Sequence, residues 1–183
     1  MLVIAGSVRP KRICLDVAAW VAAAARDVLS NQVEVIDLKD WALPMDGEPG
    51  LPHRGDYRLE ATRAWSRKVG AAQGMVFVTP QYNWGYPAPL KNALDHLYTE
   101  WAGKPAVIVA YGGHGGDRCA RQLREVLTGL HMRPMRTTLR LPLRRDLIEA
   151  DLASIDAAVE FAPQERRLRR ALGQLGRCLP GPG

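Results

Sequence analysis

The stretch GMVFVTPQYNWGYPAPLKNALDHL, residues 74–97, decides how this chain folds. Residues 74–79 form a continuous apolar run, which is typical of a buried strand in a parallel sheet. Residues 90–97 predict a helix. Between them, residues 80–87 place three aromatic rings, two prolines and two side-chain amides in one strand-to-helix loop. Loops of this kind line the ligand crevice of an open α/β sheet, so this one suits a flat heteroaromatic ligand.

Strand and helix patterns alternate along the whole chain. Strands are predicted over residues 2–5, 33–36, 74–79, 106–110 and, as an edge strand, 136–141. Helices are predicted over residues 13–28, 57–72, 88–99, 119–130, 148–159 and 168–175, the last as a separate helix or a continuation after Pro163. Residues 41–56 are rich in proline and glycine and predict a long loop. The alternation predicts an α/β fold, a doubly wound five-stranded parallel sheet with helices on both faces.

Length and composition limit the classes of protein to consider. The chain has 183 residues, 47% of them hydrophobic, a net charge of +6 and a pI of about 9.5. We expect one domain over residues 1–178 and a flexible tail over 179–183. Three distant cysteines and four histidines show no metal-ligand spacing, so we expect no metal. No apolar run approaches the roughly 20 residues that span a bilayer, and a cytoplasmic location is the default.

The loop after the first strand, GSVRPKR at residues 6–12, has the chemistry of an anion site. It combines the Ser7 hydroxyl, two guanidinium groups and the N–H groups of a helix start, which together suit a terminal phosphate. It matches neither a Walker loop nor a GxGxxG motif. The same residues are compatible with a solvated basic loop in which Ser7 caps the helix. Asp37, after the second strand, is expected to form a turn.

The loop after the fourth strand, YGGHGGD at residues 111–117, contains four glycines. Glycine allows a backbone to approach a ligand closely and to adopt positive φ angles. This loop is predicted to lie beside residues 80–87, at the same edge of the sheet. Alone it could be a flexible connector, but three unusual loops at one edge indicate a binding site.

These motifs resemble the NAD(P)H-dependent FMN reductase family, which has a flavodoxin-like fold. Residues 6–12 are similar to its GSxRxxR-type phosphate loop. Residues 80–83, Pro87 and residues 90–95 are similar to its P-E-Y-N…P…LKNAxD signature, the most specific of the three. Residues 112–115 are similar to its glycine-rich loop. The likeness covers roughly residues 1–140, in matching order and spacing.

The resemblance implies roles for individual residues. It assigns the FMN phosphate to Ser7, Arg9, Arg12 and the amides near Ile13 and Cys14. It assigns the flavin ring to Pro80, Gln81, Tyr82 and Asn83 on one side and to Gly112, Gly113 and His114 on the other. Departures from the family pattern are Gln81 in place of glutamate, Lys11 and Cys14 in place of small residues, and the bulky Trp84, which would narrow the acceptor pocket.

The resemblance also implies an activity. Hydride would pass from NADPH or NADH, through bound FMN, to a flavin, quinone, azo or similar small-molecule acceptor. No catalytic side chain is assigned, although His114 and Tyr82 are best placed to adjust acceptor binding. A homodimer or homotetramer is expected, with residues 41–56 and the helix after Pro87 as candidate contacts. The alternatives are a non-catalytic FMN-binding or electron-carrier protein and, through Arg166–Arg170, a nucleic-acid binder; a docked helix with a basic outer face is the preferred interpretation of that segment.

Overall fold

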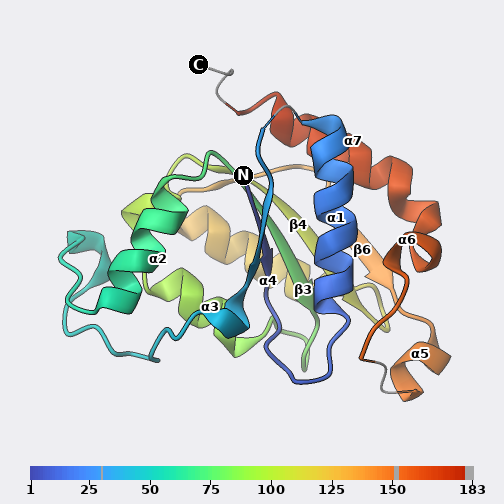
Figure 1. The fold of residues 1–183 in the computed structure, drawn as a ribbon, viewed down its shortest axis with the longest axis horizontal. Coiled ribbons are helices and arrows are strands. Elements are labelled where there is room, and N and C mark those ends of the chain that lie inside the picture. Colours follow the sequence, from blue (N-terminus) through green and yellow to red (C-terminus); the bar gives the residue numbers. More distant parts are fainter. Residues whose placement is uncertain (30, 151–152, 180–183) are drawn as a thin grey trace.

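The computed structural model describes residues 1–29, 31–150 and 153–179. One parallel β-sheet lies at its centre (Figure 1). The strands are β1 (Leu2–Ala5), β2 (Glu34–Asp37), β3 (Met75–Pro80), β4 (Pro105–Gly112), β5 (Arg133–Pro134) and β6 (Leu139–Pro142). Their order is β2-β1-β3-β4, and β5 and β6 both pair with β4. Each of these pairings is parallel, which confirms the predicted five-position parallel sheet.

The fifth position of the sheet is divided between β5 and β6. β5 pairs with Pro105 and Ala106 at the start of β4, and β6 pairs with residues 109–112 at its end. Arg124, from α4 (Asp117–Gly129), satisfies the groups in between. Its guanidinium donates to the carbonyls of Pro134 and Met135, at 3.3 and 2.6 Å, and to the Thr138 hydroxyl at 2.8 Å. The predicted strand over 136–141 is therefore shorter and later than expected, because a side chain replaces the ladder there.

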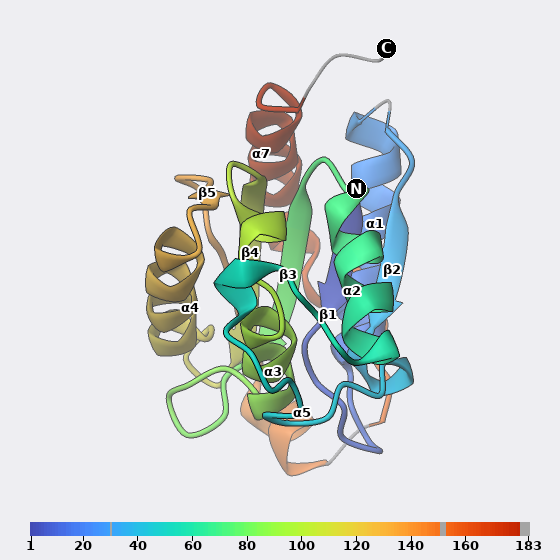
Figure 2. The ribbon, with the colours of Figure 1, turned by 90° about the vertical axis from the view of Figure 1, so that its left-hand side faces the viewer.

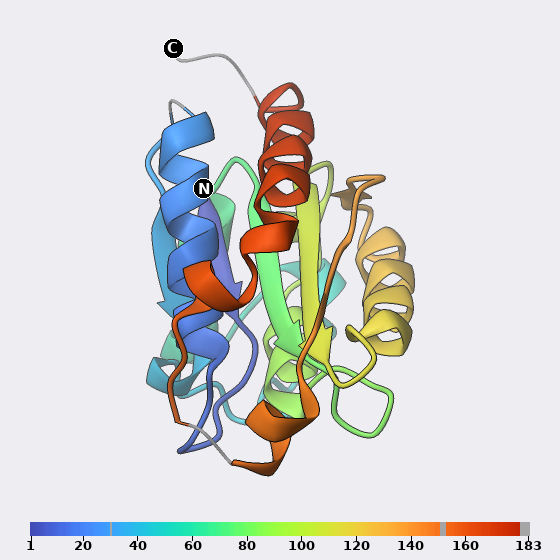
Figure 3. The ribbon, with the colours of Figure 1, turned by 90° about the vertical axis from the view of Figure 1, so that its right-hand side faces the viewer.

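Helices cover both faces of the sheet. In Figure 2, α2 (Glu60–Gly70), α3 (Ala88–Asp95) and α4 lie in front of the strands. In Figure 3, α1 (Cys14–Val28), α6 (Ala157–Glu160) and α7 (Glu165–Gly176) cover the opposite face. Alternate residues of β3 point to opposite faces of the sheet. Val76 and Val78 pack against the layer of α1 and α7, and Met75 and Phe77 pack against the layer of α2, α3 and α4. The predicted flavodoxin-like fold, with helices on both faces, is confirmed.

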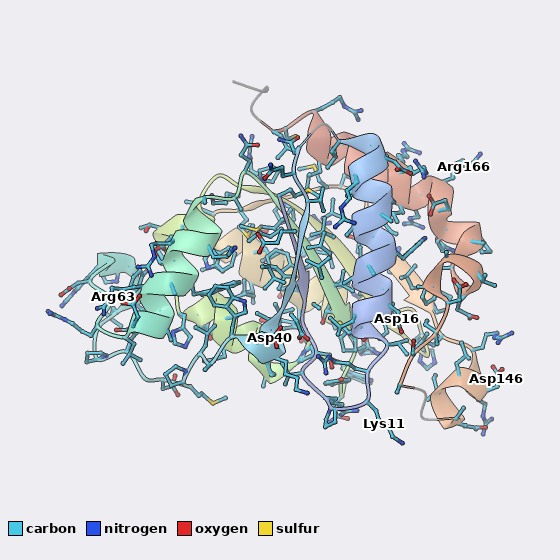
Figure 4. The ribbon with its side chains drawn as sticks, viewed as in Figure 1. Lys11, Asp16, Asp40, Arg63, Asp146 and Arg166 are labelled. Atoms are coloured by element: carbon cyan, nitrogen blue, oxygen red, sulfur yellow. The ribbon has the colours of Figure 1, made fainter. Side chains whose placement is uncertain are left out.

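The prediction of one helix over residues 148–159 is wrong. The chain forms two short helices instead, α5 (Arg145–Glu149) and α6, and residues 151–152 lie outside the described part. Asp156 begins α6 by accepting the amides of Ala158 and Val159, both at 3.1 Å. The Ile155 amide donates to Asp16 in the first turn of α1, at 2.9 Å (Figure 4). These local and tertiary contacts outweigh the apolar spacing that suggested one helix.

The last helix, α7, docks through its apolar side. Leu168, Leu172 and Leu175 are fully buried in the layer that contains α1, whereas Arg166 is exposed on the outer side (Figure 4). Arg169 binds Asp27 of α1 at 2.9 Å and Glu165 at 2.6 Å. This is the predicted docked helix with a basic outer face.

Short 3-10 turns complete the architecture: η1 (Leu38–Asp40), η2 (Pro52–Arg54), η3 (Thr99–Trp101) and η4 (Ala162–Gln164). Leu179 is partly buried against the core, and the last four residues of the predicted tail lie outside the described residues. Within the described ranges, no helix combines the length and apolar character needed to cross a bilayer.

Candidate functional site

Three loops meet at the carboxyl edge of the sheet, at the lower side of Figure 3. They follow β1, β3 and β4, as the sequence predicts for an open α/β crevice. Backbone hydrogen bonds align their starts: Gly6 N–H donates to Val78 O at 2.8 Å, and Gln81 N–H donates to Tyr111 O at 2.9 Å. The short helix α5 lies at the same edge (Figure 3). The fold therefore brings the three predicted motifs together.

The loop between β1 and α1 has two features of a phosphate site. Ser7 is fully buried. Helix α1 starts after Ile13, whose apolar side chain makes no capping hydrogen bond to the first-turn N–H groups. A helix start of this kind attracts an anion through its amides and its dipole. Lys11 lies at the tip of the same loop (Figure 4).

Arg12 lies beneath this loop with only 8% of its side chain exposed. Its Nη2 donates to Asp37 Oδ2 at 2.5 Å, and its Nη1 donates to the Arg9 carbonyl at 2.7 Å. Its Nε is buried and has no hydrogen-bond partner in the part of the chain that the structure describes. A buried cationic N–H without an acceptor is costly, which makes this atom a fit for a ligand oxygen. Asp37 also accepts the Lys39 amide at 3.0 Å, so its predicted turn-forming role is confirmed.

Arg9 and Tyr82 link the first loop to the second. The Arg9 guanidinium lies 3.8 Å from the centre of the Tyr82 ring, a cation–π contact. The Tyr82 hydroxyl lies 2.7 Å from the Ser7 hydroxyl, and either group can donate. Three of the predicted site residues are thus in direct contact, although they lie up to 75 positions apart in the chain.

Cys14 offers the site a backbone amide but no reactive thiol. It is the first residue of α1, and its fully buried side chain donates to Val78 O at 3.6 Å. Burial raises the pKa of the Cys14 thiol, and burial likewise raises the pKa of the neighbouring Tyr111 hydroxyl. Both groups therefore remain neutral at physiological pH.

The second loop ends in a tight two-residue turn. Tyr82 and Gly85 exchange backbone hydrogen bonds of 2.8 and 2.9 Å. The two central residues, Asn83 and Trp84, have positive φ angles of 46° and 72°. Asparagine tolerates this region, but it is rare for a bulky residue. Trp84 is also 59% exposed, and Pro80 is buried as the last residue of β3.

Gln81 contacts the next helix. Its Oε1 accepts the backbone amides of Arg118 and Cys119, at 3.1 and 3.2 Å, in the first turn of α4. The N-cap of α4, Gly116, has no side chain to do this. Gln81 is therefore a helix cap supplied from another element, a role that the flavin-lining prediction did not include.

The glycine-rich loop turns sharply between β4 and α4. Gly115 and Gly116 have φ angles of 68° and 69°, and a Cβ on Gly116 would lie 2.8 Å from the Ala110 Cβ. Only glycine fits this position without displacement of β4. Gly112 is the last residue of β4, Gly113 follows it, and the side chain of His114 is exposed.

Three further residues at this edge were not predicted from the sequence. A Cβ on Gly113 would lie 3.4 Å from Ile148 of α5, which is 49% exposed. Arg118 stacks on Trp84, with 3.4 Å between its guanidinium carbon and the ring centre. Asp37 pairs with Arg12. Each of these contacts joins segments far apart in the sequence, and the predicted helix over 148–159 concealed α5.

The comparisons with known proteins agree with this geometry. The family model for NADPH-dependent FMN reductase matches residues 1–143. An NAD(P)H-dependent FMN reductase of Schizosaccharomyces pombe is 51% identical over 176 residues, which is 95% of this chain and 87% of the relative. One of Saccharomyces cerevisiae is 49% identical over 71% of this chain and 74% of its own length.

A solved structure shares the fold. A flavoenzyme NAD(P)H:(acceptor) oxidoreductase from Paracoccus denitrificans superposes with a TM-score of 0.69, at 19% identity, over 98% of both chains. The predicted enzyme class, an FMN-dependent NAD(P)H oxidoreductase, is confirmed. The chain belongs to the NADPH-dependent FMN reductase family.

Proposed function

We propose that the FMN phosphate binds between the start of α1 and Arg12. The observation that carries this proposal is the buried Arg12 Nε, which has no hydrogen-bond partner among residues 1–29, 31–150 and 153–179. The first-turn amides of α1 supply further donors. The Ser7 hydroxyl lies on the same loop and now contacts Tyr82 at 2.7 Å. Charge-assisted bonds of this type contribute about 1.5–3 kcal/mol each, enough to fix the position of a phosphate.

The flavin ring is then expected between the turn at residues 82–85 and the glycine-rich loop. The bond from Gln81 N–H to Tyr111 O ties these two loops together. Rigid walls orient a flat ring and exclude water from one of its faces. When bound, FMN supplies the hydride chemistry, which the side chains of this site do not provide. The protein's part is to bind and orient, and we assign no catalytic acid or base.

A planar apolar acceptor, a quinone or a free flavin, fits the exposed side of this site. Trp84, in the turn, and Ile148, beside Gly113 of the glycine-rich loop, are 59% and 49% exposed. Surfaces of this kind favour flat aromatic ligands. A quinone reductase of Escherichia coli that is 41% identical over 52% of this chain supports the quinone class.

We further propose a homodimer or homotetramer that assembles through an apolar groove. Its lining comprises the apolar residues Val8, Leu38, Trp41, Leu43, Met45, Ala88 and Pro89, together with Lys39 and Asn92. Met45 is 68% exposed there, although it lies beside buried apolar residues. The groove joins the two segments that the sequence analysis named as contacts, residues 41–56 and the start of α3. The three unpaired cysteines are consistent with a cytoplasmic location.

The decisive experiment for the activity is an anaerobic visible spectrum of the FMN-loaded protein, before and after NADPH is added. We expect rapid bleaching of the flavin band and reoxidation by an added benzoquinone. A bound flavin that NADPH fails to bleach would indicate a carrier instead. Bleaching without reoxidation by quinone, but with transfer to free FMN, would select the flavin as acceptor.

Sedimentation of the Met45→Asp variant tests the assembly. A buried charge at a subunit contact is costly, so we expect dissociation to monomers. Val159→Asp is the control, because Val159 is 72% exposed on α6, on the other face of the sheet. An unchanged mass for Met45→Asp would exclude this groove as the contact.

A further inference from the structure

Trp84 is held in an exposed and unfavourable position by the turn around it. Its φ angle of 72° is rare for a bulky residue, and 59% of its surface is open to solvent. The paired hydrogen bonds between Tyr82 and Gly85 keep the turn closed. A Cβ on Gly85 would lie 3.3 Å from Gln122 Oε1, so the turn packs along α4. Figure 2 shows this loop beside α4, at the rim of the site.

Arg118 lies on this tryptophan and carries an uncompensated charge. Its guanidinium carbon is 3.4 Å from the centre of the Trp84 ring. No carboxylate pairs with it among the residues that the structure describes. Its neighbour in the chain, Asp117, is engaged at 2.6 Å by both Arg121 and Arg140. Three arginines against one aspartate leave a net positive charge beside an exposed aromatic ring.

A guanidinium stacked face-on over a ring keeps its N–H groups available at its edge. Those N–H groups match two oxygens of a phosphate, and the stacked pair offers a flat surface to a nucleobase. Such a combination suits a purine nucleotide with a phosphate close to the base. Trp84 lies within the turn and Arg118 lies in the first turn of α4, directly after the glycine-rich loop, so the pair borders the pocket that we propose for the flavin.

We propose that Trp84 and Arg118 bind the adenosine end of the dinucleotide and select NADPH over NADH through its 2′-phosphate. Trp84 contributes the surface for adenine, and Arg118 contributes the charge for the additional phosphate. This inference rests on the proposed placement of FMN between the two loops. It gives Trp84 a role in binding the hydride donor, in addition to the narrowing of the acceptor pocket that the sequence analysis expected.

Isothermal titration of the FMN-loaded protein with adenosine 2′,5′-bisphosphate and with ADP tests the proposal. We expect Arg118→Ala to weaken the bisphosphate by about 10-fold or more, the loss of one charge-assisted contact, and ADP by less than about threefold. Arg121→Ala is the matched control on the same helix, because Arg121 is already paired with Asp117. It should change both affinities by less than about threefold, since exposed pairs contribute little.

Trp84→Gly separates the stacking surface from the charge. Glycine accepts the left-handed φ of this position, so the turn is retained. We expect this variant to lose affinity for both ligands. The proposal would be overturned if Arg118→Ala lost equal affinity for both ligands, or if Arg118→Ala and Arg121→Ala had equal effects. It would also be overturned if the wild-type protein bound ADP as tightly as the bisphosphate. Flavin bleaching by NADPH in the same preparation tests the oxidoreductase activity separately.

Discussion

Arg12 and Asp37 form a nearly buried ion pair that ties the loop after β1 to the end of β2. The joined atoms, Arg12 Nη2 and Asp37 Oδ2, are 2.5 Å apart, and 8% and 14% of the two side chains are exposed. The pair fixes the guanidinium so that its buried Nε has no hydrogen-bond partner among the described residues. The carboxylate therefore holds the cation ready for a second anion.

Asp37→Asn should destabilise the protein by about 3 kcal/mol, because it leaves a buried charge without its partner. Asparagine can keep the bond from the Lys39 amide, but its Nδ2 then replaces the oxygen that accepts from Arg12, so both the charge and this hydrogen bond are lost. Urea unfolding measures it. Asp56→Asn is the control: Asp56 pairs with Arg58 at 2.7 Å, but both are 67% exposed, and less than about 1 kcal/mol is expected.

Addition of FMN should raise the melting temperature of Asp37→Asn more than that of the wild type. In this variant the FMN phosphate gives Arg12 an anionic partner again, and no carboxylate at position 37 competes with the phosphate for the guanidinium. Equal shifts in the two proteins would show that Arg12 does not contact the phosphate.

Gly116→Ala should impair both folding and FMN binding. Position 116 has a φ of 69°, and its new Cβ would lie 2.8 Å from Ala110 Cβ and 2.9 Å from Tyr111 N. Left-handed backbone and overpacking together cost about 2–4 kcal/mol. Gly113→Ala is the control for stability, because its Cβ would meet Ile148 at an ordinary 3.4 Å, and its stability should change by less than about 0.5 kcal/mol. Thermal unfolding compares the stability of the two variants, and FMN fluorescence quenching compares Gly116→Ala with the wild type. A Gly116→Ala variant as stable as Gly113→Ala would contradict this account of the loop.

The sequence predicted the sheet well because short continuous apolar runs such as 75–79 are typical of strands that are buried on both faces of a parallel sheet. It failed at residues 148–159, where Ile148 and Val159 have helical spacing but end 49% and 72% exposed. Spacing alone cannot tell a buried helix face from two short helices. Asp156 was the local signal against one helix, since it is a good N-cap before a run of small residues.

Within the site, the sequence placed the three loops but not the partners of their side chains. Gln81 was assigned to the flavin, yet its amide caps a helix that begins 36 residues later. Arg12 was assigned to the phosphate, yet two of its nitrogens already bind Asp37 and the Arg9 carbonyl. Contacts of this kind depend on how distant elements are brought together, and no local pattern encodes them.

Glu48 should make stability depend on pH in the acid range. Its carboxylate accepts the amides of Arg58 and Leu59, at 2.8 and 3.0 Å, just before α2. Burial by itself would raise the pKa of Glu48, but these amides and the Thr62 hydroxyl outweigh it and lower the pKa below its usual 4.5. The stabilisation is therefore fully present above about pH 4.5 and is lost as the pH falls through the lower folded-state value.

Glu48→Gln removes this titrating group and tests the direction in which stability changes with pH. We expect the stability difference between wild type and variant to be constant from pH 6 to pH 8 and to shrink below about pH 4.5, with a size under about 1 kcal/mol because solvent screens the group. Urea unfolding across this range measures it. A difference that grows on acidification would contradict the assigned hydrogen bonds.

Gln81→Glu should stabilise the protein and leave the loop in place. A carboxylate can accept the same two amides of Arg118 and Cys119, and its charge is favoured at the start of a helix by about 0.3–1 kcal/mol. Gln81→Ala, by contrast, should cost about 1 kcal/mol, the usual effect of removing a cap.

The reactivity of Cys119 measures whether this helix start is intact. Burial raises the pKa of the Cys119 thiol to about 12, so it should resist a thiol reagent at pH 8. If α4 frays in Gln81→Ala, Cys119 reacts faster there than in the wild type and in Gln81→Glu. Equal reaction rates in all three proteins would show that the helix start does not depend on Gln81.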